Sequence, residues 1–322
     1  MPKFLIIRFS SIGDIVLTTP VIRCLKKQVK DAEVHFLTKT SFREIIEHNP
    51  YIDKKIYFEN DLDATVKQLK SENYNYIIDL HHNLRTFIIK LRLMKRSYAF
   101  SKINFQKWLI VNFKINTLPQ KHIVDRYFET VKSFEVENDG AGLDYFIIPE
   151  DEKIIQQLPP SHQQGYIGFV IGAKHNTKKL PVEKIISICS KINFPVILIG
   201  GKEDYQIAEN IIASSPTSIF NACGKFSVNQ SAAIVKYAHT IITHDTGFMH
   251  IAAAFKKRII SVWGNTIPEF GMYPYNTEES KIAEVENLYC RPCSKIGFDK
   301  CPKVHFRCMR EIDEGEIIKA IG

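Results

Sequence analysis

The sequence predicts an α/β protein built from two doubly wound, Rossmann-like parallel-sheet domains that face each other across an interdomain cleft. Its 322 residues exceed the usual size of one domain. Short β-rich runs alternate with helical patterns, as in βαβ units. The alternation stops at a linker rich in glycine and proline, between about residues 139 and 160, and then starts again. We therefore expect an N-terminal domain at 1–150, a C-terminal domain at 160–312 and a final helix at 313–322.

The first half contains four strand patterns separated by helical ones. Apolar positions Val16, Leu17, Val21 and Leu25 recur at helical spacing and predict a helix at 14–29. Because each helix lies in a crossover between strands, the sheet should be parallel. The expected strands are 4–9, 33–37, 55–58 and 76–80, and the other expected helices are 41–48, 62–72 and 126–134.

The second half repeats this organisation. Pro181 suits the first position of a helix at 182–192. Ligands of such sheets bind at the carboxyl ends of the strands, so the turns that follow the strands are the candidate sites. The expected strands are 166–171, 195–199, 217–220, 240–243 and 258–262, and the further helices are 204–214, 229–237, 247–255 and 313–321.

Composition is that of an ordinary soluble globular protein, with 45% hydrophobic and 24% charged residues. The apolar run Phe4 to Ile7 is too short for a signal-peptide core or a membrane span. Seven cysteines without an export signal favour reduced thiols or a metal site over a disulfide framework. We therefore expect a cytoplasmic protein.

The net charge of +8 is unevenly distributed, because no Asp or Glu occurs from Leu80 to Val124. An anionic partner with an apolar part, such as a membrane surface, suits this stretch. The alternative is a pair of amphipathic helices with aromatic side chains in the core and lysines in solvent. No nucleic-acid-binding module is recognisable, so we expect no nucleic acid partner. The stretch holds Arg85, Lys90, Arg92, Lys95, Arg96, Lys102, Lys107, Lys114 and Lys121, with Phe87, Tyr98, Phe100, Phe105, Trp108 and Phe113 among them.

The turn SSIGD follows the first strand at residues 10–14. A polar turn at the carboxyl end of a strand places a carboxylate where a substrate would react. Asp14 is therefore a candidate general base toward an acceptor hydroxyl. The alternative is a helix N-cap that satisfies backbone amides only. The turn lacks GxGxxG, which disfavours a nicotinamide site.

A basic turn follows the first strand of the second half. It contains Lys174, Thr177, Lys178 and Lys179 just before a helix. Positive side chains and free helix amides bind a pyrophosphate, whereas the alternative is an exposed charged loop. GxxxxGK[ST] is absent, which argues against P-loop chemistry.

The most specific motif is THDTGFMHIAAA at 243–254. Asp245 can cap the following helix, Gly247 permits close approach of a ligand to the backbone, and the Thr246 hydroxyl can contact phosphate oxygens. The alternative is a capped core helix in which His250 has ordinary hydrogen-bond partners.

Together these three turns resemble glycosyltransferase family 9, which includes the lipopolysaccharide heptosyltransferases. The segments IDLHHNLR (78–85) and HIVDRY (122–127) and the cysteine-rich segment near the end also look like family sequence. The resemblance implies a GT-B type fold, inverting chemistry and no catalytic metal. It places the catalytic base on Asp14 and the phosphate-binding lysine on Lys178. One departure is WGNT at 263–266, where many relatives have Gly followed by Pro.

The resemblance also assigns binding residues and partners. It implies transfer of heptose, or a related sugar, from ADP-heptose to an anionic, lipid-linked lipopolysaccharide core acceptor at the inner-membrane surface. The alternatives are a transferase for another surface glycan, a nucleotide-sugar epimerase, or a non-catalytic, zinc-stapled protein that binds an anionic polymer. Expected donor contacts are Thr177, Lys179, Asp245, Thr246, Gly247 and His250, and expected acceptor contacts are Ser11, Gly13, His81, Arg85 and Arg126.

Four cysteines form a separate pattern near the end of the chain: Cys290, Cys293, Cys301 and Cys308. One CxxC pair followed by two wider spacings is compatible with a structural zinc site, with His305 as a possible substitute ligand. Reduced thiols or a labile disulfide are the alternative.

Overall fold

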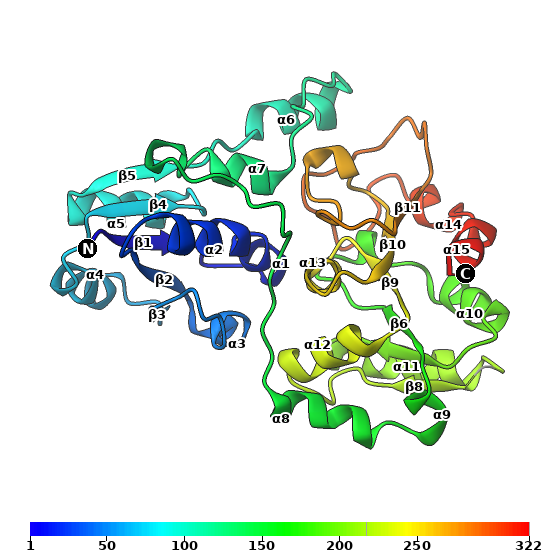
Figure 1. Ribbon diagram of the computed structural model, residues 1–322. Coiled ribbons are helices and arrows are strands. Elements are labelled where there is room, and N and C mark those ends of the chain that lie inside the picture. Colours follow the sequence, from blue (N-terminus) through cyan, green and yellow to red (C-terminus); the bar gives the residue numbers. More distant parts are fainter. Residues whose placement is uncertain (217, 322) are drawn as a thin grey trace. The chain divides into compact units, whose positions relative to one another are not determined.

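A computed structural model describes residues 1–216 and 218–321 (Figure 1). The chain forms two compact units. The N-terminal unit comprises Met1–Lys102 and Lys121–Phe146, and the C-terminal unit comprises Ile103–Gln120 and the chain from Ile147 onward. Each unit contains one parallel sheet. In the part of the chain that is described, no helix is long and apolar enough to cross a membrane.

The N-terminal sheet has the strand order β3-β2-β1-β4-β5, and every pair is parallel. β1 lies in the middle and is fully apolar from Phe4 to Ile7, all of them completely buried, as expected for a strand covered on both faces. The strands are β1 (Lys3–Ile7), β2 (Glu33–Lys39), β3 (Lys54–Phe58), β4 (Tyr76–Asp79) and β5 (Arg96–Ala99), and the helices are α1 (Ile12–Val16), α2 (Thr19–Gln28), α3 (Arg43–Ile46), α4 (Leu62–Ser71), α5 (Leu84–Leu93) and α7 (Ile123–Phe128).

Several expectations for this unit were wrong in detail. The single helix predicted at 14–29 is two helices, because Pro20 lies in the first turn of α2 and the hydroxyls of Thr18 and Thr19 bond back to carbonyls of α1. The segments 41–48 and 126–134 each contain a shorter α-helix and a 3₁₀ turn. The edge strand β5 was missed, because its four residues, Arg96 to Ala99, form no apolar run.

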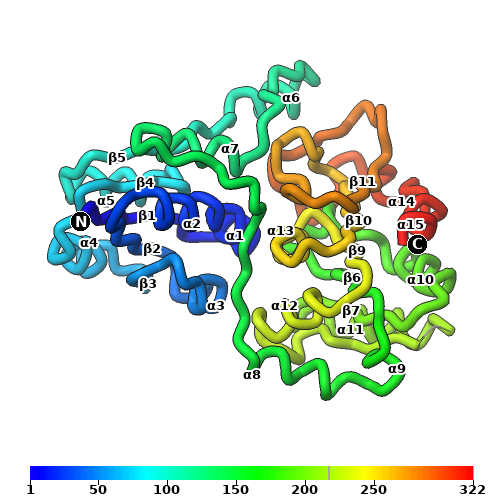
Figure 2. Tube along the Cα trace, viewed as in Figure 1, coloured from blue at the N-terminus to red at the C-terminus, as the bar shows by residue number. Residues whose placement is uncertain are grey.

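The C-terminal sheet has the order β11-β10-β9-β6-β7-β8 and is also parallel throughout. Its predicted elements are confirmed to within a few residues, except that Thr217 of the expected strand 217–220 and Gly322 of the last helix lie outside the described residues. Figure 2 follows the chain through this unit. Its elements are α8 (Pro149–Glu152), α9 (Pro160–Gln163), β6 (Ile167–Val170), α10 (Val182–Lys191), β7 (Val196–Ile199), α11 (Tyr205–Ala213), β8 (Ile219–Asn221), α12 (Val228–Tyr237), β9 (Thr240–His244), α13 (Gly247–Ala254), β10 (Arg258–Trp263), β11 (Ser280–Glu284), α14 (Arg307–Arg310) and α15 (Glu314–Ile321).

One helix from the first half of the sequence belongs to the C-terminal unit. α6 (Asn104–Phe113) contributes Ile110 to a small apolar cluster with Ile267 and Phe270. Just after it, the Lys114 ammonium donates to the carbonyl oxygens of Cys290 and Pro292, at 3.2 and 2.7 Å. The N-terminal unit is therefore not the continuous segment 1–150 that the sequence predicts.

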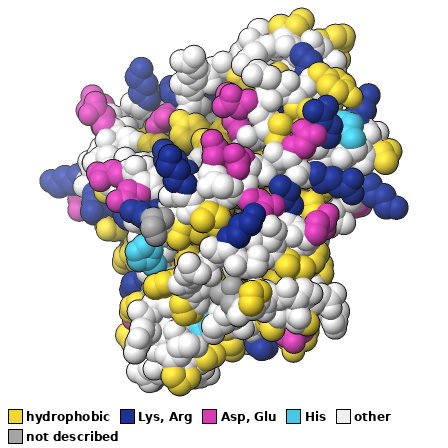
Figure 3. Space-filling view, turned by 90° about the vertical axis from the view of Figure 1, so that its right-hand side faces the viewer, with side chains coloured by type: hydrophobic (Ala, Val, Ile, Leu, Met, Phe, Trp, Pro, Cys, Tyr) yellow, Lys and Arg dark blue, Asp and Glu magenta, His cyan; other side chains and the backbone are white. Residues whose placement is uncertain are grey.

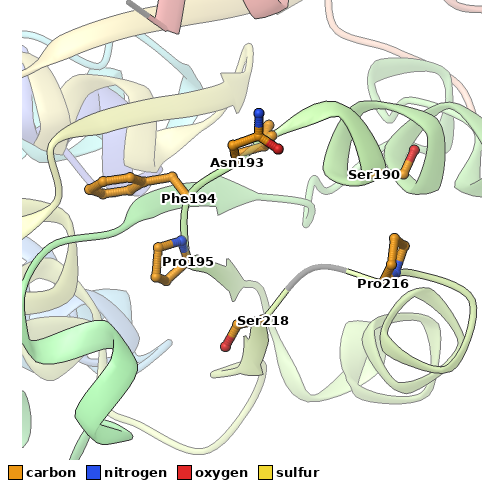
Figure 4. Close-up of a pocket in the computed structure, with 7 residues that line it drawn as sticks. Ser190, Asn193, Phe194, Pro195, Pro216 and Ser218 are labelled. Atoms are coloured by element: carbon orange, nitrogen blue, oxygen red, sulfur yellow. The ribbon is translucent and has the colours of Figure 1, made fainter.

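A cavity of about 380 Å³ lies at the amino ends of β7 and β8, where Asn193, Phe194, Pro195 and Ser218 are among its lining residues (Figure 4). The motif turns are at the other, carboxyl ends of the strands of this sheet. This cavity therefore contains none of the predicted site residues.

Candidate active site

Asp14 lies in the turn after β1, at the carboxyl end of the N-terminal sheet. Its Oδ1 is 2.6 Å from Nη2 of Arg8, and its Oδ2 accepts hydrogen bonds from the amide and hydroxyl of Ser11 at 3.1 and 2.8 Å. Ser11 is the N-cap of α1, and Asp14 occupies the third helical position of a capping box. The alternative in which Asp14 is itself the N-cap is therefore wrong, although its carboxylate still closes the first turn.

The Arg8 guanidinium holds this carboxylate from the core side. Arg8 is buried, and it also donates to the carbonyl oxygen of Leu80 and to the Tyr127 hydroxyl. Burial alone would raise the pKa of Asp14, but the charge of Arg8 and the hydrogen bonds from Ser11 outweigh it, so the pKa is lowered. Asp14 is thus ionised at neutral pH, as a proton acceptor must be.

His81 follows β4 in a turn organised by the buried carboxylate of Asp79. One oxygen of Asp79 accepts a hydrogen bond from the His81 amide at 3.1 Å, and the other lies 2.8 Å from Nζ of Lys90. Burial and then the charges of Arg8 and Lys102 lower the pKa of His81 to about 4, so its imidazole is neutral at pH 7. These couplings place His81 in the same cluster as the ion pair described above.

The other predicted acceptor contacts differ in accessibility. The Arg85 guanidinium lies over the rings of Phe9 and Phe58, 5.4 and 4.8 Å from their centroids. Arg126 is only 4% exposed, and burial lowers its pKa. Gly13 is buried inside α1. Half-buried Arg85 is accessible, whereas Arg126 and Gly13 lie beneath the surface, and their roles in acceptor binding stay predictions.

In the C-terminal unit, two of the motif turns meet. Nζ of Lys178 is 2.5 Å from Oδ2 of Asp245, and the same oxygen accepts a hydrogen bond from the Thr266 hydroxyl at 2.9 Å. Lys178 follows β6 in a 3₁₀ turn (Asn176–Lys178), Asp245 follows β9, and Thr266 follows β10. Three adjacent strands therefore bring one cation, one carboxylate and one hydroxyl together at their carboxyl ends, which excludes the alternative of a simple exposed loop for the basic turn.

The amino end of α13 adjoins this cluster. Thr246 is its N-cap, but the Thr246 side chain accepts no hydrogen bond from the first-turn amides. Asp245 therefore does not cap the helix as predicted, because its carboxylate is engaged by Lys178. An amino end without a side-chain cap favours an anionic ligand. His250 is buried one turn further along.

Two buried side chains, those of His244 and Thr177, hold the basic turn in place. The fully buried His244 accepts a hydrogen bond from the Leu180 amide at 2.9 Å, and burial lowers its pKa to about 3. The Thr177 hydroxyl exchanges hydrogen bonds with the backbone of Phe298 at 3.0 and 2.8 Å. Thr177 therefore holds the turn to a later loop.

Lys179 points to a different partner from that of Lys178. Its Nζ lies 2.8 Å from Oδ1 of Asp204, a carboxylate that is 2% exposed. The other oxygen of Asp204 accepts a hydrogen bond from the Gly201 amide at 2.9 Å. Of the two neighbouring lysines, only Lys178 is directed at the α13 cluster.

The turn after β10 is tightly held. A Cβ at Gly264 would lie 2.8 Å from the Thr177 carbonyl oxygen, so only glycine fits there. The Arg291 side chain donates to the carbonyl oxygens of Gly264 and Thr266 at 2.6 and 2.9 Å. Between them, the side chain of Asn265 is 1% exposed, and neither its oxygen nor its nitrogen has a hydrogen-bond partner in the structure.

The cysteine segment folds against this turn, since the Cys293 amide donates to the Asn265 carbonyl oxygen at 3.2 Å. All four cysteines are free thiols, and Sγ of Cys290 is 3.8 Å from Nε2 of His305. Among residues 1–216 and 218–321, no three His, Cys, Asp or Glu side chains are arranged to hold a metal ion. The four-thiolate site therefore finds no support in this geometry and stays a prediction.

The family model described as Glycosyltransferase family 9 (heptosyltransferase) matches residues 63–301, which is more than half of the chain. The chain belongs to glycosyltransferase family 9. Among curated relatives of this family 9 protein, lipopolysaccharide heptosyltransferase 1 of Campylobacter coli is 26% identical over 345 residues, covering 99% of this chain and 98% of that relative. Lipooligosaccharide heptosyltransferase 2 of Campylobacter jejuni is 22% identical over 318 residues, covering 96% of this chain and 93% of that relative.

Solved structures confirm the fold of this family 9 transferase. The glycosyl transferase family 9 structure from Veillonella parvula superimposes with a TM-score of 0.80 at 22% identity, covering 99% of this chain and 96% of that chain. E. coli ADP-heptose lps heptosyltransferase II gives a TM-score of 0.78 at 16% identity, covering 99% and 97%. The predicted GT-B type fold, with two parallel-sheet α/β domains, is confirmed.

Sequence reasoning missed several residues of this family 9 protein that organise the two clusters. Arg8 looked like the end of an apolar strand, and Lys102 like one cation in a basic stretch. Arg291 and Asn265 carried no motif of their own. The one available signal was the departure at WGNT, which contains Asn265.

Proposed function

We propose that this protein is an inverting glycosyltransferase that moves heptose, or a related sugar, from ADP-heptose to a lipopolysaccharide core acceptor containing Kdo or heptose. The observation that carries the proposal is the Lys178–Asp245–Thr266 cluster beside the amino end of α13. Such a site suits a diphosphate. The heptosyltransferase names of relatives that match nearly the full chain support the choice of sugar.

In this scheme Asp14 accepts the proton of an acceptor hydroxyl while that oxygen forms a bond to the anomeric carbon of the donor sugar. The bond from the anomeric carbon to the diphosphate oxygen breaks, and the diphosphate departs with the electron pair. Lys178 and the amides of α13 stabilise its charge. One displacement inverts the anomeric centre. Because protein groups neutralise the leaving group, no catalytic metal is required.

The environment of Asp14 shapes this role. Its lowered pKa keeps it ionised but makes it a weak base. Proton transfer should therefore accompany departure of the diphosphate rather than precede it. The acceptor hydroxyl would share a carboxylate oxygen with Arg8 or Ser11, which orient the group.

The decisive experiment measures ADP release from ADP-heptose with a Kdo-bearing acceptor. Asp14→Asn should abolish release but keep donor binding, seen as an unchanged thermal shift with donor. Asp61→Asn is the matched control, since Asp61 caps α4 in the same unit and asparagine also caps well. Turnover by Asp14→Asn equal to that of the unmodified protein would rule out Asp14 as the base.

A transferase for another surface glycan is the second candidate, favoured by the Asn265 turn, where the chain departs from many relatives. A thermal-shift screen of nucleotide sugars separates the two, because the true donor should give the largest stabilisation. If no nucleotide sugar shifts the melting temperature, the non-catalytic polymer-binding alternative gains instead.

Localisation and metal content complete the proposal. We place the enzyme in the cytoplasm, associated peripherally with the inner membrane where a lipid-linked acceptor is found. A structural zinc on Cys290, Cys293, Cys301 and Cys308 remains a proposal. One zinc per chain in protein purified without chelator, lost in Cys293→Ser, would support it, whereas metal-free protein with titratable thiols would contradict it.

A further inference from the structure

Helix α5 presents an apolar face to solvent. Leu84, Phe87, Leu91 and Met94 are between 56% and 87% exposed, and their spacing puts them on one side of the helix. The opposite side packs inward through Thr86, Ile89 and Leu93. The helix therefore has two apolar faces, and only one of them is used by the fold of its unit.

Basic side chains border this outer face. Arg92 pairs with Asp63 and Lys90 with buried Asp79, so these two cations have partners within the unit. Lys95 and Arg96 are exposed where the helix ends. One exposed acidic side chain, Asp63 of α4, lies at this border through its ion pair with Arg92. The sequence from Leu80 to Val124 itself supplies no acidic residue, so Lys95 and Arg96 leave the border with a net positive charge.

Helix α6, in the other unit, repeats the pattern with aromatic residues. Phe105, Trp108 and Phe113 are all more than 40% exposed, and their rings contact one another, with centroids 6.1 and 5.1 Å apart. The alternative that the aromatic residues of this stretch form a core is therefore wrong for these side chains. Figure 3 shows one face of the molecule, on which basic and acidic side chains are mixed.

We propose that the outward face of α5, in the N-terminal unit, and the outward face of α6, in the C-terminal unit, each bind the surface of an anionic phospholipid bilayer. Leu, Phe, Met and Trp side chains enter the boundary between headgroups and acyl chains, and neighbouring Lys and Arg side chains attract anionic headgroups. Each helix has ten residues, so it lies in the interface and does not span it. A protein partner with an acidic groove would match the same charge, but a border with a net positive charge, whose one acidic side chain is paired with Arg92, fits a uniformly anionic surface better.

This inference deepens the proposed function, because an enzyme bound to the bilayer meets a lipid-linked acceptor in the plane of that bilayer. It can nevertheless be tested without donor or acceptor. Failure of vesicle binding and failure of sugar transfer are therefore separate results.

The test is cosedimentation of the full chain with vesicles of phosphatidylethanolamine and phosphatidylglycerol, compared with vesicles of phosphatidylcholine alone. The unmodified protein should bind the anionic vesicles and lose binding at high salt. Phe87→Ser with Leu91→Ser, and separately Phe105→Ser with Trp108→Ser, should each weaken partitioning at least about tenfold. Charge reversal by Lys95→Glu with Arg96→Glu should weaken it by a similar factor.

Control variants replace other exposed side chains elsewhere. Tyr237→Ser with Ile282→Ser removes two exposed apolar residues, and Lys30→Glu with Lys319→Glu reverses two exposed charges; both should bind like the unmodified protein. Unchanged melting temperatures exclude misfolding of the variants. If one helix variant does misfold, the charge-reversal variant still tests the proposal.

Equal binding to neutral vesicles, or no effect of any helix variant, would overturn the proposal. So would a change of oligomeric mass in the variants with vesicle binding unaltered, because a second chain would then cover these faces.

A kinetic comparison gives an independent readout. The helix variants should keep the kcat/KM of the unmodified enzyme on a deacylated, soluble acceptor and lose activity only on acceptor embedded in vesicles. Equal losses on both acceptors would place the effect in the active site and contradict a membrane role.

Discussion

The ionisation of Asp14 depends on two neighbours, the buried guanidinium of Arg8 and the hydrogen bonds from Ser11. Because the pKa of Asp14 in the folded protein is lowered, its carboxylate stays charged as pH falls through the usual range of aspartate. The ion pair therefore contributes stability above the unfolded pKa, and that stability is lost only as pH falls through the lowered folded value.

A pH profile of kcat/KM should show this. The acid limb of the unmodified enzyme is expected below the ordinary aspartate pKa, and in Arg8→Gln it should move to higher pH because the stabilising charge is gone. Melting temperatures recorded at the same pH values separate loss of fold from titration. An acid limb at the same pH in both proteins would show that Arg8 does not tune this group.

Asn265 is a buried carboxamide whose polar atoms have no partner within the described structure. Asn265→Leu should therefore leave stability unchanged or raise it by about 1–3 kcal/mol, since an unsatisfied polar group is removed. If the carboxamide contacts the donor, the thermal shift caused by donor should shrink in the same variant. Urea unfolding and donor titration measure the two effects.

Asn221 provides the comparison for that experiment. It is equally buried, but its side chain bonds to the Tyr205 carbonyl oxygen, to Glu209 and to the Cys223 amide. Asn221→Leu should cost about 1–3 kcal/mol of stability. Equal destabilisation by both substitutions would mean that Asn265 has partners in solution.

At the scale of single residues, the sequence points to candidate reacting groups but not to the residues that hold them in place. Asp14 and Lys178 stand in short motifs at strand ends, which makes them recognisable. Arg8 contacts Leu80 and Tyr127 through the fold, and no local pattern encodes contacts across such separations. The assigned roles of the site residues still await experiment.

Among the elements, the turn between β6 and α10 has a division of labour that can be tested. Lys178→Gln should lower kcat by about 100-fold or more, since a cation near the leaving diphosphate is lost. Lys179→Gln should instead destabilise the fold by about 3 kcal/mol, because it leaves the buried Asp204 carboxylate without its cation. Steady-state kinetics and urea unfolding of both variants distinguish these outcomes, and reversed effects would exchange the assigned roles.

Elements with a strong periodic pattern were predictable, and those shaped by distant contacts were not. β6, β7, β9 and β10 are buried apolar runs that the sequence shows directly. β5 is a four-residue edge strand without an apolar run, and β11 (SKIAE) has only two adjacent apolar residues, so neither has a clear hydrophobic signal. The break before α2 depends on Pro20, and the apolar spacing that predicts one helix at 14–29 does not show this break.

For the whole molecule, two compact units should unfold as two cooperative transitions. ADP should raise the transition of the C-terminal unit, because ligands stabilise the state that binds them. Ile110→Ala should lower that same transition by about 2 kcal/mol through loss of packing on Ile267 and Phe270. Ile89→Ala, in the N-terminal core, should lower the other one.

Differential scanning calorimetry with and without ADP checks this assignment. The informative result is that Ile110, from the first half of the sequence, affects the transition that ADP raises. If Ile110→Ala and Ile89→Ala lower the same transition, the segment 103–120 would belong energetically to the N-terminal unit. A single transition in all samples would show that the units unfold together.

The fold class was predictable because the alternation of strands and helices repeats twice along the chain. The boundary between the units was not, because α6 is bound by residues far ahead of it in the sequence, and only the folded structure reveals that attachment.

The placement of 103–120 matters for anyone who recombines these enzymes. A chimera that joins the first half of one family member to the second half of another at a single point near the linker would pair α6 of one parent with the turn around Ile267 of the other. Exchange of the N-terminal unit should therefore use three junctions, near residues 102, 120 and 146, so that the segment stays with the C-terminal unit that holds it.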